Sequence, residues 1–129
     1  MEAVGDARVS LGEAPLWHGR EGRIYWVDIN GKTVRRVVGE TSELVFEGVM
    51  VTALAETVDG ELVMVSSDGL FVWREGEVTR LTSLDLPDGV RTNDGKCDPE
   101  GRLWFGTMDL EMSNPIGALL RYDGNSVEM

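Results

Sequence analysis

Short apolar segments, separated by turns, run along the whole chain. No window keeps the three- and four-residue apolar spacing of an amphipathic helix, and Gly and Asp interrupt the chain at short intervals. Pairs such as Asp59-Gly60 and Asp68-Gly69 separate many of the segments, as hairpin connections require. The pattern therefore predicts an all-β protein with antiparallel pairing. The predicted strands are Arg23–Asp28, Thr33–Val38, Glu43–Phe46, Val51–Glu56, Leu62–Ser66, Gly69–Trp73, Val78–Leu81, Leu103–Met108 and Ala118–Tyr122.

A sequence repeat groups these strands. The run Gly-Arg-Ile-Tyr-Trp-Val that begins at Gly22 recurs as Gly-Glu-Leu-Val-Met-Val from Gly60 and as Gly-Arg-Leu-Trp-Phe-Gly from Gly101. The repeat is about 40 residues long, which is the period of a four-stranded propeller blade. We therefore predict a β-propeller fold in which three four-stranded blades form a single partial domain over residues 1–129. The predicted blades cover about 11–48, 49–88 and 89–129.

Three blades do not close a ring, because propellers typically need four to eight. The segment Ala3–Ser10 is predicted to be an outermost strand that completes a last blade lying elsewhere, and Ser126–Met129 to be the outermost strand of the third blade. Two explanations stay open. The chain is half of a longer propeller, which is the favoured interpretation, or two copies assemble six blades around a twofold axis.

Composition narrows the classes of partner and compartment. The net charge of −11 and the pI near 4.4 oppose binding to nucleic acid or to an anionic membrane surface. No apolar run is long enough to span a bilayer, and the N-terminus lacks the basic and apolar regions of a secretory signal.

The single cysteine, Cys97, permits no internal disulfide and is expected to be half-buried in a strand. A cytoplasmic location is therefore expected. The four Trp residues are expected in the core.

The densest group of polar side chains precedes the strand Leu103–Met108. Arg91 and Asn93 alternate along an extended segment, so both are expected to point to the same side. Their donors and acceptor suit a polar ligand with hydroxyl groups. The alternative is a loop ion pair and an Asx-turn. The sequence Asn93-Asp94-Gly95 is typical of a hairpin turn, but the Lys-Cys-Asp-Pro run that follows argues against one. Asp98 is expected to accept hydrogen bonds from turn amides.

Glu13 is the candidate metal ligand. It lies at the entry to a predicted inner strand, from which its carboxylate can project into a central channel, and hard divalent cations favour oxygen ligands. The alternative is a solvated surface Glu. His18, the only histidine, lies in a polar loop and is expected to be solvated rather than catalytic. No phosphate loop, nucleophile elbow, paired-Cys metal motif or EF-hand spacing is present.

Two motifs, in order and at compatible separations, resemble those of a known family. Gly12-Glu13-Ala14-Pro15-Leu16-Trp17 resembles the opening Gly-Glu-x-Pro-x-Trp motif of the senescence marker protein (regucalcin)/gluconolactonase family, and Ile24–Ile29 resembles the strand that follows it. The run Arg91–Met108 is similar to a second family signature at almost every position. The resemblance covers essentially the whole chain but reaches only the N-terminal half of the family's six-bladed fold.

The resemblance implies a metal-dependent hydrolase acting on a sugar lactone. It assigns Glu13 as one ligand of a divalent ion (Ca²⁺, Zn²⁺, Mn²⁺ or Mg²⁺) and Arg91, Asn93 and Glu111 as substrate-binding residues. The catalytic Asp base and the remaining metal ligands of the family lie in the later blades, beyond residue 129. The isolated half is therefore expected to have little or no activity. Its expected partners are a small-molecule lactone and either the missing half or a second copy.

Two other kinds of function remain open at this point. The chain could belong to a non-catalytic propeller that binds a partner protein, since one fold hosts many functions. It could also belong to a calcium-binding regulatory protein. A hydrolase acting on organophosphates or other esters is a further alternative within the enzyme class.

Overall fold

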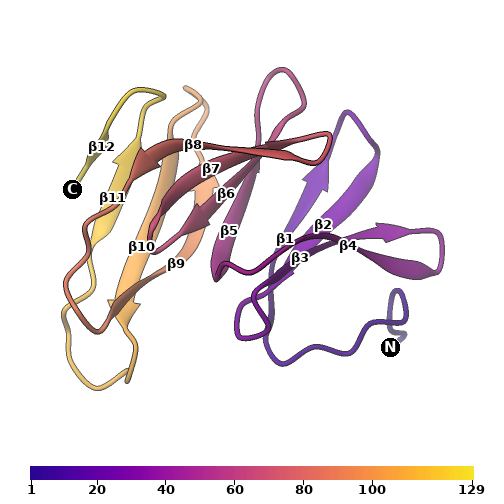
Figure 1. Ribbon diagram of the computed structural model, residues 1–129, viewed down its shortest axis with the longest axis horizontal. Coiled ribbons are helices and arrows are strands. Elements are labelled where there is room, and N and C mark those ends of the chain that lie inside the picture. Colours follow the sequence, from indigo (N-terminus) through magenta and orange to yellow (C-terminus); the bar gives the residue numbers. More distant parts are fainter.

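Three four-stranded antiparallel sheets make up the computed structural model, which describes residues 1–129 (Figure 1). No helix in it has the length and apolar character needed to cross a membrane. The first sheet contains β1 (Gly12–His18), β2 (Arg23–Asp28), β3 (Thr33–Val38) and β4 (Thr41–Glu47). The second contains β5 (Val51–Glu56), β6 (Leu62–Ser66), β7 (Gly69–Arg74) and β8 (Glu77–Ser83). The third contains β9 (Val90–Cys97), β10 (Leu103–Asp109), β11 (Leu119–Tyr122) and β12 (Val127–Glu128).

The sheets are successive blades of a propeller. Within each, the strands pair in chain order, and β5 of the middle blade packs against both β1 and β9. These three strands form the inner edges, and β4, β8 and β12 form the outer edges. The chain termini lie on opposite flanks of the fan, beside the first and the third blade (Figure 1). The predicted all-β fold of three four-stranded blades is confirmed.

The segment Ala3–Ser10, predicted to complete a blade lying elsewhere, forms no strand with the rest of this chain. It runs beside the first blade, where the Asp6 carboxylate accepts a hydrogen bond from the Ser42 amide at 3.0 Å. Each of the three sheets already holds four strands, so no blade within the chain offers this segment a partner strand. Its pairing with a blade elsewhere stays a prediction.

Two apolar layers hold the blades together, and both use the same repeat positions. Between the first and second blades, the fully buried Tyr25 shares a cluster with Leu62 and Met64. Between the second and third, Val63 shares a cluster with Leu103 and Phe105. In the second strand of a blade, the third residue after the repeat glycine faces the next blade. The second and fourth residues after that glycine face the previous blade, because successive side chains alternate across a sheet.

The expectation that the Trp residues form the core is wrong. None of the four is buried, and Trp17 is 61% exposed. Strand alternation places Trp17 and Trp26 on the uncovered flank of the first blade and Trp104 on the uncovered flank of the third. Cys97 lies in a strand as expected, but it is exposed rather than half-buried, because it is the last residue of an inner strand.

The expectation that His18 is solvated is also wrong, because its side chain is buried. It ends β1 at the junction of the first two blades. Its Nδ1 lies 3.1 Å from Glu56 Oε1, and its Nε2 lies 3.0 Å from the carbonyl oxygen of Gly60. Glu56 also accepts hydrogen bonds from the amides of Gly19 and Arg20, at 3.2 and 3.0 Å. A loop of the first blade is thereby fastened to the second blade.

Replacing Glu56 by Ala is expected to lower the free energy of unfolding by about 1 kcal/mol, since hydrogen bonds to two amides and the His18 contact are lost. The amide of Arg20 is the main cause that lowers the pKa of Glu56. The stabilisation is therefore present above the unfolded-state pKa of Glu, about 4.3, and is lost as the pH falls through the lower folded-state pKa. Urea unfolding at pH 7 and at acidic pH measures both effects. Equal stabilities of Glu56→Ala and wild type at pH 7 would contradict this role.

Candidate active site

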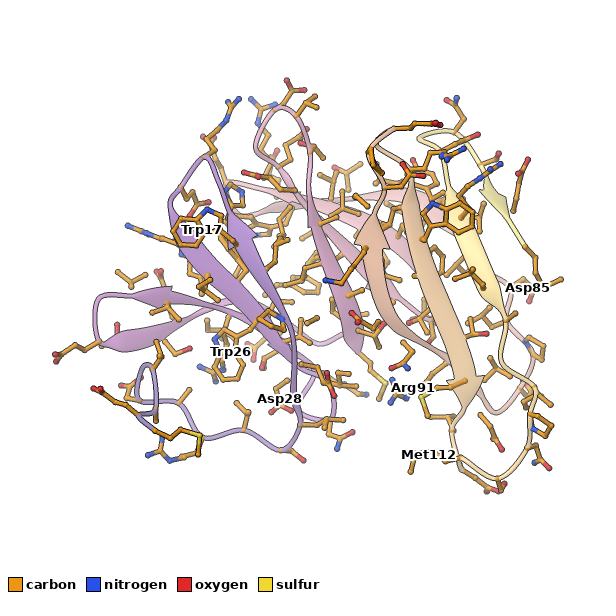
Figure 2. The ribbon with its side chains drawn as sticks, turned by 180° about the vertical axis from the view of Figure 1, so that it is seen from behind. Trp17, Trp26, Asp28, Asp85, Arg91 and Met112 are labelled. Carbon is orange, nitrogen blue, oxygen red and sulfur yellow. The ribbon has the colours of Figure 1, made fainter.

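One end of the blades is built from polar side chains at the ends of the second strands. Asp28, Ser66 and Thr107 occupy the same repeat position, and each is hydrogen-bonded to the loop or strand that follows it. The Ser66 hydroxyl donates to the Gly69 carbonyl at 3.0 Å, and the Thr107 hydroxyl accepts from the Ala118 amide at 2.8 Å. Asp28 and Arg91 both lie toward this end in Figure 2, whereas Trp17 lies toward the other. The repeat thus fixes the loops that carry candidate site residues.

Asp28 positions the beginning of the innermost strand of the first blade. Its carboxylate accepts hydrogen bonds from the amides of Ser10, Leu11 and Gly31, at 3.2, 3.0 and 3.1 Å. Burial alone raises the pKa of Asp28, but the three amides outweigh it and hold the pKa below its ordinary value. A Cβ on Gly31 would lie 2.2 Å from Asp28 Oδ2, so only glycine allows this approach. Glu13 follows this fixed segment by two residues.

Each inner strand contains a β-bulge near this end. The register shifts by one residue between Glu13 and Leu16 in β1, and around Thr52 in β5. In β9 the shift falls at Asn93 and Asp94, so this sequence continues the strand rather than forming a hairpin turn, as expected. Bulges of this kind re-aim side chains and are common beside active sites.

Glu13 is exposed on a concave surface formed by the three inner strands. It lines a groove of about 460 Å³ together with Glu56, Asp94 and Lys96. The neighbouring Ala14 adopts a φ of 51°, a left-handed conformation that costs about 1 kcal/mol for a residue with a Cβ. No side chain or amide hydrogen-bonds to the Glu13 carboxylate. Its lone pairs are therefore free to bind a cation or a polar ligand.

Arg91 and Asn93 lie on β9, which is held to the middle blade by buried hydrogen bonds. The Thr52 hydroxyl donates to the Thr92 hydroxyl at 2.8 Å and lies 3.0 Å from the Asn93 carbonyl oxygen. The Thr92 side chain therefore points toward the middle blade. Asn93 lies at the bulge of β9, where the alternation of side chains is interrupted, so the prediction that Arg91 and Asn93 point to the same side stays a prediction. Arg91 is half-buried and donates from Nη1 to the Thr92 carbonyl at 3.0 Å. The Asn93 side chain is exposed.

Glu111 lies in the loop between β10 and β11, which is organised by Asp109. The Asp109 carboxylate accepts hydrogen bonds from the amides of Glu111, Ser113 and Asn114 at 3.2, 3.1 and 2.9 Å. The amide of Asn114 is the main cause that lowers the pKa of Asp109. The loop is therefore irregular but anchored. The Glu111 side chain itself is exposed.

Glu13 and Arg91 lie on the inner strands β1 and β9, but the structure does not place them in one cavity. Glu13 lines the groove between the inner strands, whereas Arg91 lines a separate hollow of about 280 Å³ with Ser66, Ser67 and Leu110. β5 lies between the strands that carry Glu13 and Arg91. Two positioning residues, Asp28 and Asp109, were not singled out from the sequence. The signal that identifies them is an Asp directly before a loop with Asn and Gly or Ser, since such carboxylates accept turn amides.

The family resemblance implies a divalent metal, and the Glu13 side chain is of a type that can bind such an ion. Its carboxylate is the hard oxygen donor that Ca²⁺ or Mg²⁺ prefers, and it has no competing partner. No group of three His, Cys, Asp or Glu side chains in the chain is placed to hold a metal ion. The chain therefore supplies one suitable ligand and not a complete metal centre.

Comparison with known proteins identifies relatives along the whole chain. The family model described as SMP-30/Gluconolactonase/LRE-like region matches residues 11–129. The chain is 36% identical over 140 aligned positions to the Bacillus subtilis protein YvrE, a sugar lactone lactonase by name, and 31% identical over 129 positions to L-arabinolactonase of Azospirillum brasilense. A crystal structure of a calcium-binding protein, regucalcin, from Agrobacterium tumefaciens superposes with a TM-score of 0.85 at 29% identity.

The chain spans less than half the length of these relatives. It is covered completely by YvrE, to 95% by the L-arabinolactonase and to 95% by the regucalcin structure. It accounts for 47%, 43% and 43% of those proteins, respectively. The three blades therefore correspond to half of a six-bladed propeller.

Proposed function

The chain belongs to the SMP-30/gluconolactonase/LRE-like family, and on that premise we propose that it forms the N-terminal half of a metal-dependent sugar lactonase. The observation that carries the proposal is the match of the family model over residues 11–129, with two relatives that bear lactonase names. The 129 residues would act as one partial propeller domain. A cytoplasmic location is proposed on the chain's single cysteine.

In this proposal the chain's residues bind and orient the lactone. Glu13 would supply one ligand of a divalent ion, and such an ion, when bound, stabilises negative charge that develops on a carbonyl oxygen. Arg91 would donate hydrogen bonds to the sugar from its guanidinium, and the Asn93 amide would both donate and accept. Glu111 would accept from sugar hydroxyls. The anchored amides around Asp28 and Asp109 would keep Glu13 and Glu111 in position.

The proposal is tested by completing the ring. A chimera would join the 129 residues to the C-terminal half of YvrE in place of that protein's own N-terminal half. We expect it to hydrolyse gluconolactone in the presence of Ca²⁺, Zn²⁺ or Mn²⁺. The Glu13→Gln form should lose about 100-fold in kcat/KM, because a neutral amide replaces a charged metal ligand. A pH-stat assay measures the acid released.

Two controls accompany the chimera. Glu47→Gln makes the same chemical change on the outer strand of the first blade and should leave kcat/KM unchanged. The 129-residue chain alone should give no turnover above buffer with any of the three ions. A chimera that melts cooperatively yet shows no hydrolysis would overturn the proposed function. Full activity of Glu13→Gln would overturn the role of Glu13 while leaving the lactonase activity standing.

A further inference from the structure

One hollow at the loop end of the blades, which we call the Arg91 hollow, is formed by segments of all three blades. Its volume is about 280 Å³. Lys32 lies in the turn between β2 and β3, Ser67 and Asp68 lie in the turn between β6 and β7, and Arg91 lies on β9. Figure 2 shows Arg91 toward this end of the blades. Because these walls belong to three neighbouring blades, the hollow does not depend on a blade outside this chain.

The Arg91 hollow carries positive charge in an acidic chain. Lys32 and Arg91 line it, and neither forms an ion pair with any of the 23 acidic side chains. Asp68 is the only acidic residue of the lining, and it is exposed. Two cations thus outnumber one carboxylate, whereas the whole chain has a net charge of −11. An anionic ligand is therefore attracted here, although most of the surface repels it.

The hollow also offers hydrogen-bond donors that the fold leaves unused. Arg91 Nη1 donates to the Thr92 carbonyl at 3.0 Å, whereas the Nε and Nη2 donors of Arg91 have no acceptor in the chain. Ser67 Oγ accepts from the Thr92 amide at 3.0 Å, so its hydroxyl hydrogen remains available. A planar guanidinium matches the oxygens of a carboxylate or a phosphate. The free donors therefore suit the same kind of group as the charge does.

The Arg91 hollow is separate from the groove that contains Glu13, and β5 lies between them. A ligand that reaches both places presents a different group to each. At Glu13 the chain offers a carboxylate, which binds a cation, and in the hollow it offers cationic donors, which bind an anion. The hollow is also slightly smaller than the roughly 300–1,000 Å³ of pockets that enclose a whole small molecule. These properties suit one anionic substituent of a larger ligand.

We propose that the Arg91 hollow binds a carboxylate or phosphate group of the substrate, while the reacting lactone ring lies toward Glu13. This inference rests on the proposed lactonase function and deepens it by naming the substrate class. The preferred substrates are sugar lactones that carry an additional acidic group, rather than neutral lactones such as gluconolactone. Arg91 would hold the anion through its free donors, while Lys32 adds charge and Ser67 a hydrogen bond.

The chimera with the C-terminal half of YvrE tests this preference in a pH-stat assay. Its kcat/KM is compared for gluconolactone, for glucarolactone, which adds a carboxylate, and for phosphogluconolactone, which adds a phosphate. We expect at least one acidic lactone to be preferred over gluconolactone by roughly tenfold or more, the effect of one charge-assisted hydrogen bond. The acidic lactone that is preferred identifies the anion. Equal kcat/KM values for all three lactones would overturn the proposal.

Three variants of the chimera assign the preference to the hollow. Lys32→Gln should lower the preference for the acidic lactone by roughly tenfold, mainly through a higher KM, because a positive charge is lost. Asp68→Asn should raise the preference, because the only carboxylate of the lining is neutralised. Arg74→Gln removes the same charge from the exposed end of β7 and should leave the preference unchanged. An equal loss in Lys32→Gln and Arg74→Gln would show that net charge, and not the hollow, sets the preference.

The 129-residue chain alone tests the hollow without catalysis. In NMR titrations with glucarate and with inorganic phosphate, the amide signals of Ser67 and Thr92 should shift with at least one anion, and less in Lys32→Gln. Sorbitol, a neutral polyol, should leave these signals in place. An absence of shifts with both anions would overturn the proposal even if the chimera is active. A folded chimera that hydrolyses none of the three lactones would overturn the lactonase function, whereas anion-dependent shifts would still establish the hollow as an anion site.

Discussion

The Asp28→Ala variant is expected to unfold with roughly 3 kcal/mol less free energy than the wild-type chain, because three backbone amides lose a buried charged acceptor. Those amides belong to Ser10 and Leu11, just before β1, and to Gly31, in the turn between β2 and β3. Asp28 is 6% exposed, so water replaces the carboxylate poorly. Urea unfolding at pH 7 followed by Trp fluorescence measures the loss. Asp123→Ala is the matched control, since Asp123 accepts two turn amides in an exposed hairpin and its loss should cost clearly less than the loss of Asp28.

The difference between wild type and Asp28→Ala should depend on pH. The pKa of Asp28 is lower in the folded chain than in the unfolded chain. Its stabilisation is therefore complete above the unfolded-state value, about 3.9, and is lost as the pH falls through the lower folded-state value. The two unfolding curves should converge in strong acid. Curves that stay equally far apart from pH 7 into strong acid would show that the carboxylate charge is not the cause.

The Tyr25→Ala variant is expected to lose roughly 4 kcal/mol of stability, the range found for removal of buried aromatic side chains. Tyr25 is fully buried between the first and second blades, where its ring packs with Leu62 and Met64. Its hydroxyl donates to Glu21 Oε2 at 2.6 Å and accepts from Arg36 Nη1 at 3.1 Å. The ring thus supplies both the apolar contact and a polar link at the interface. A change of less than about 1 kcal/mol would contradict this central role.

Two further variants separate the contributions of Tyr25. Tyr25→Phe keeps the ring and should cost about 1 kcal/mol, the usual net value of a hydrogen bond. Tyr122→Ala removes a half-buried Tyr from β11, the third strand of its blade, and should cost less than Tyr25→Ala. Burial is the main cause that raises the pKa of Tyr25 to about 12. The stabilisation is complete below the unfolded-state pKa, about 10, and is lost as the pH rises from there through about 12. Tyr25→Phe should therefore lack this alkaline loss of stability.

Much of the fold could be predicted from the sequence because three independent signals agree. The predicted bounds of β2, β3, β5 and β6 coincide with those in the structure. These strands have apolar residues on both faces and are followed within four residues by Gly, Asn or Asp, so composition and turn chemistry give similar limits. The repeat then indicated that successive strands pair within one blade. When local preferences agree with the overall fold in this way, the structure can be predicted from the sequence.

The errors have a common cause, which is that a linear pattern does not show which face of a strand is covered. Trp26 and Trp104 occupy strand positions typical of a core, yet both face flanks without a neighbouring blade. His18 has polar neighbours in sequence, but its ring is buried by Glu56 and Gly60, which lie far along the chain. Long-range contacts of this kind leave no local signature.

The sequence supplied candidate site residues but did not indicate which residues hold their loops in place. Glu13, Arg91, Asn93 and Glu111 come from motif resemblance, and their roles remain predictions. The amides held by Asp28 and Asp109 depend on close approaches between loops, which only the structure displays. The other ligands of the proposed metal would lie in blades that this chain does not contain, so neither this sequence nor this structure identifies them.

The bulges of the inner strands affect which substitutions such a protein can accept during evolution. A one-residue shift reverses which side chains point inward on either side of it. In β1, the shift between Glu13 and Leu16 separates the exposed Glu13 from His18, which is buried against the second blade. Substitution of Glu13 can therefore occur without altering the packing around His18. A new ligand preference could evolve at this end of the blades while the apolar layers that hold them together stay the same.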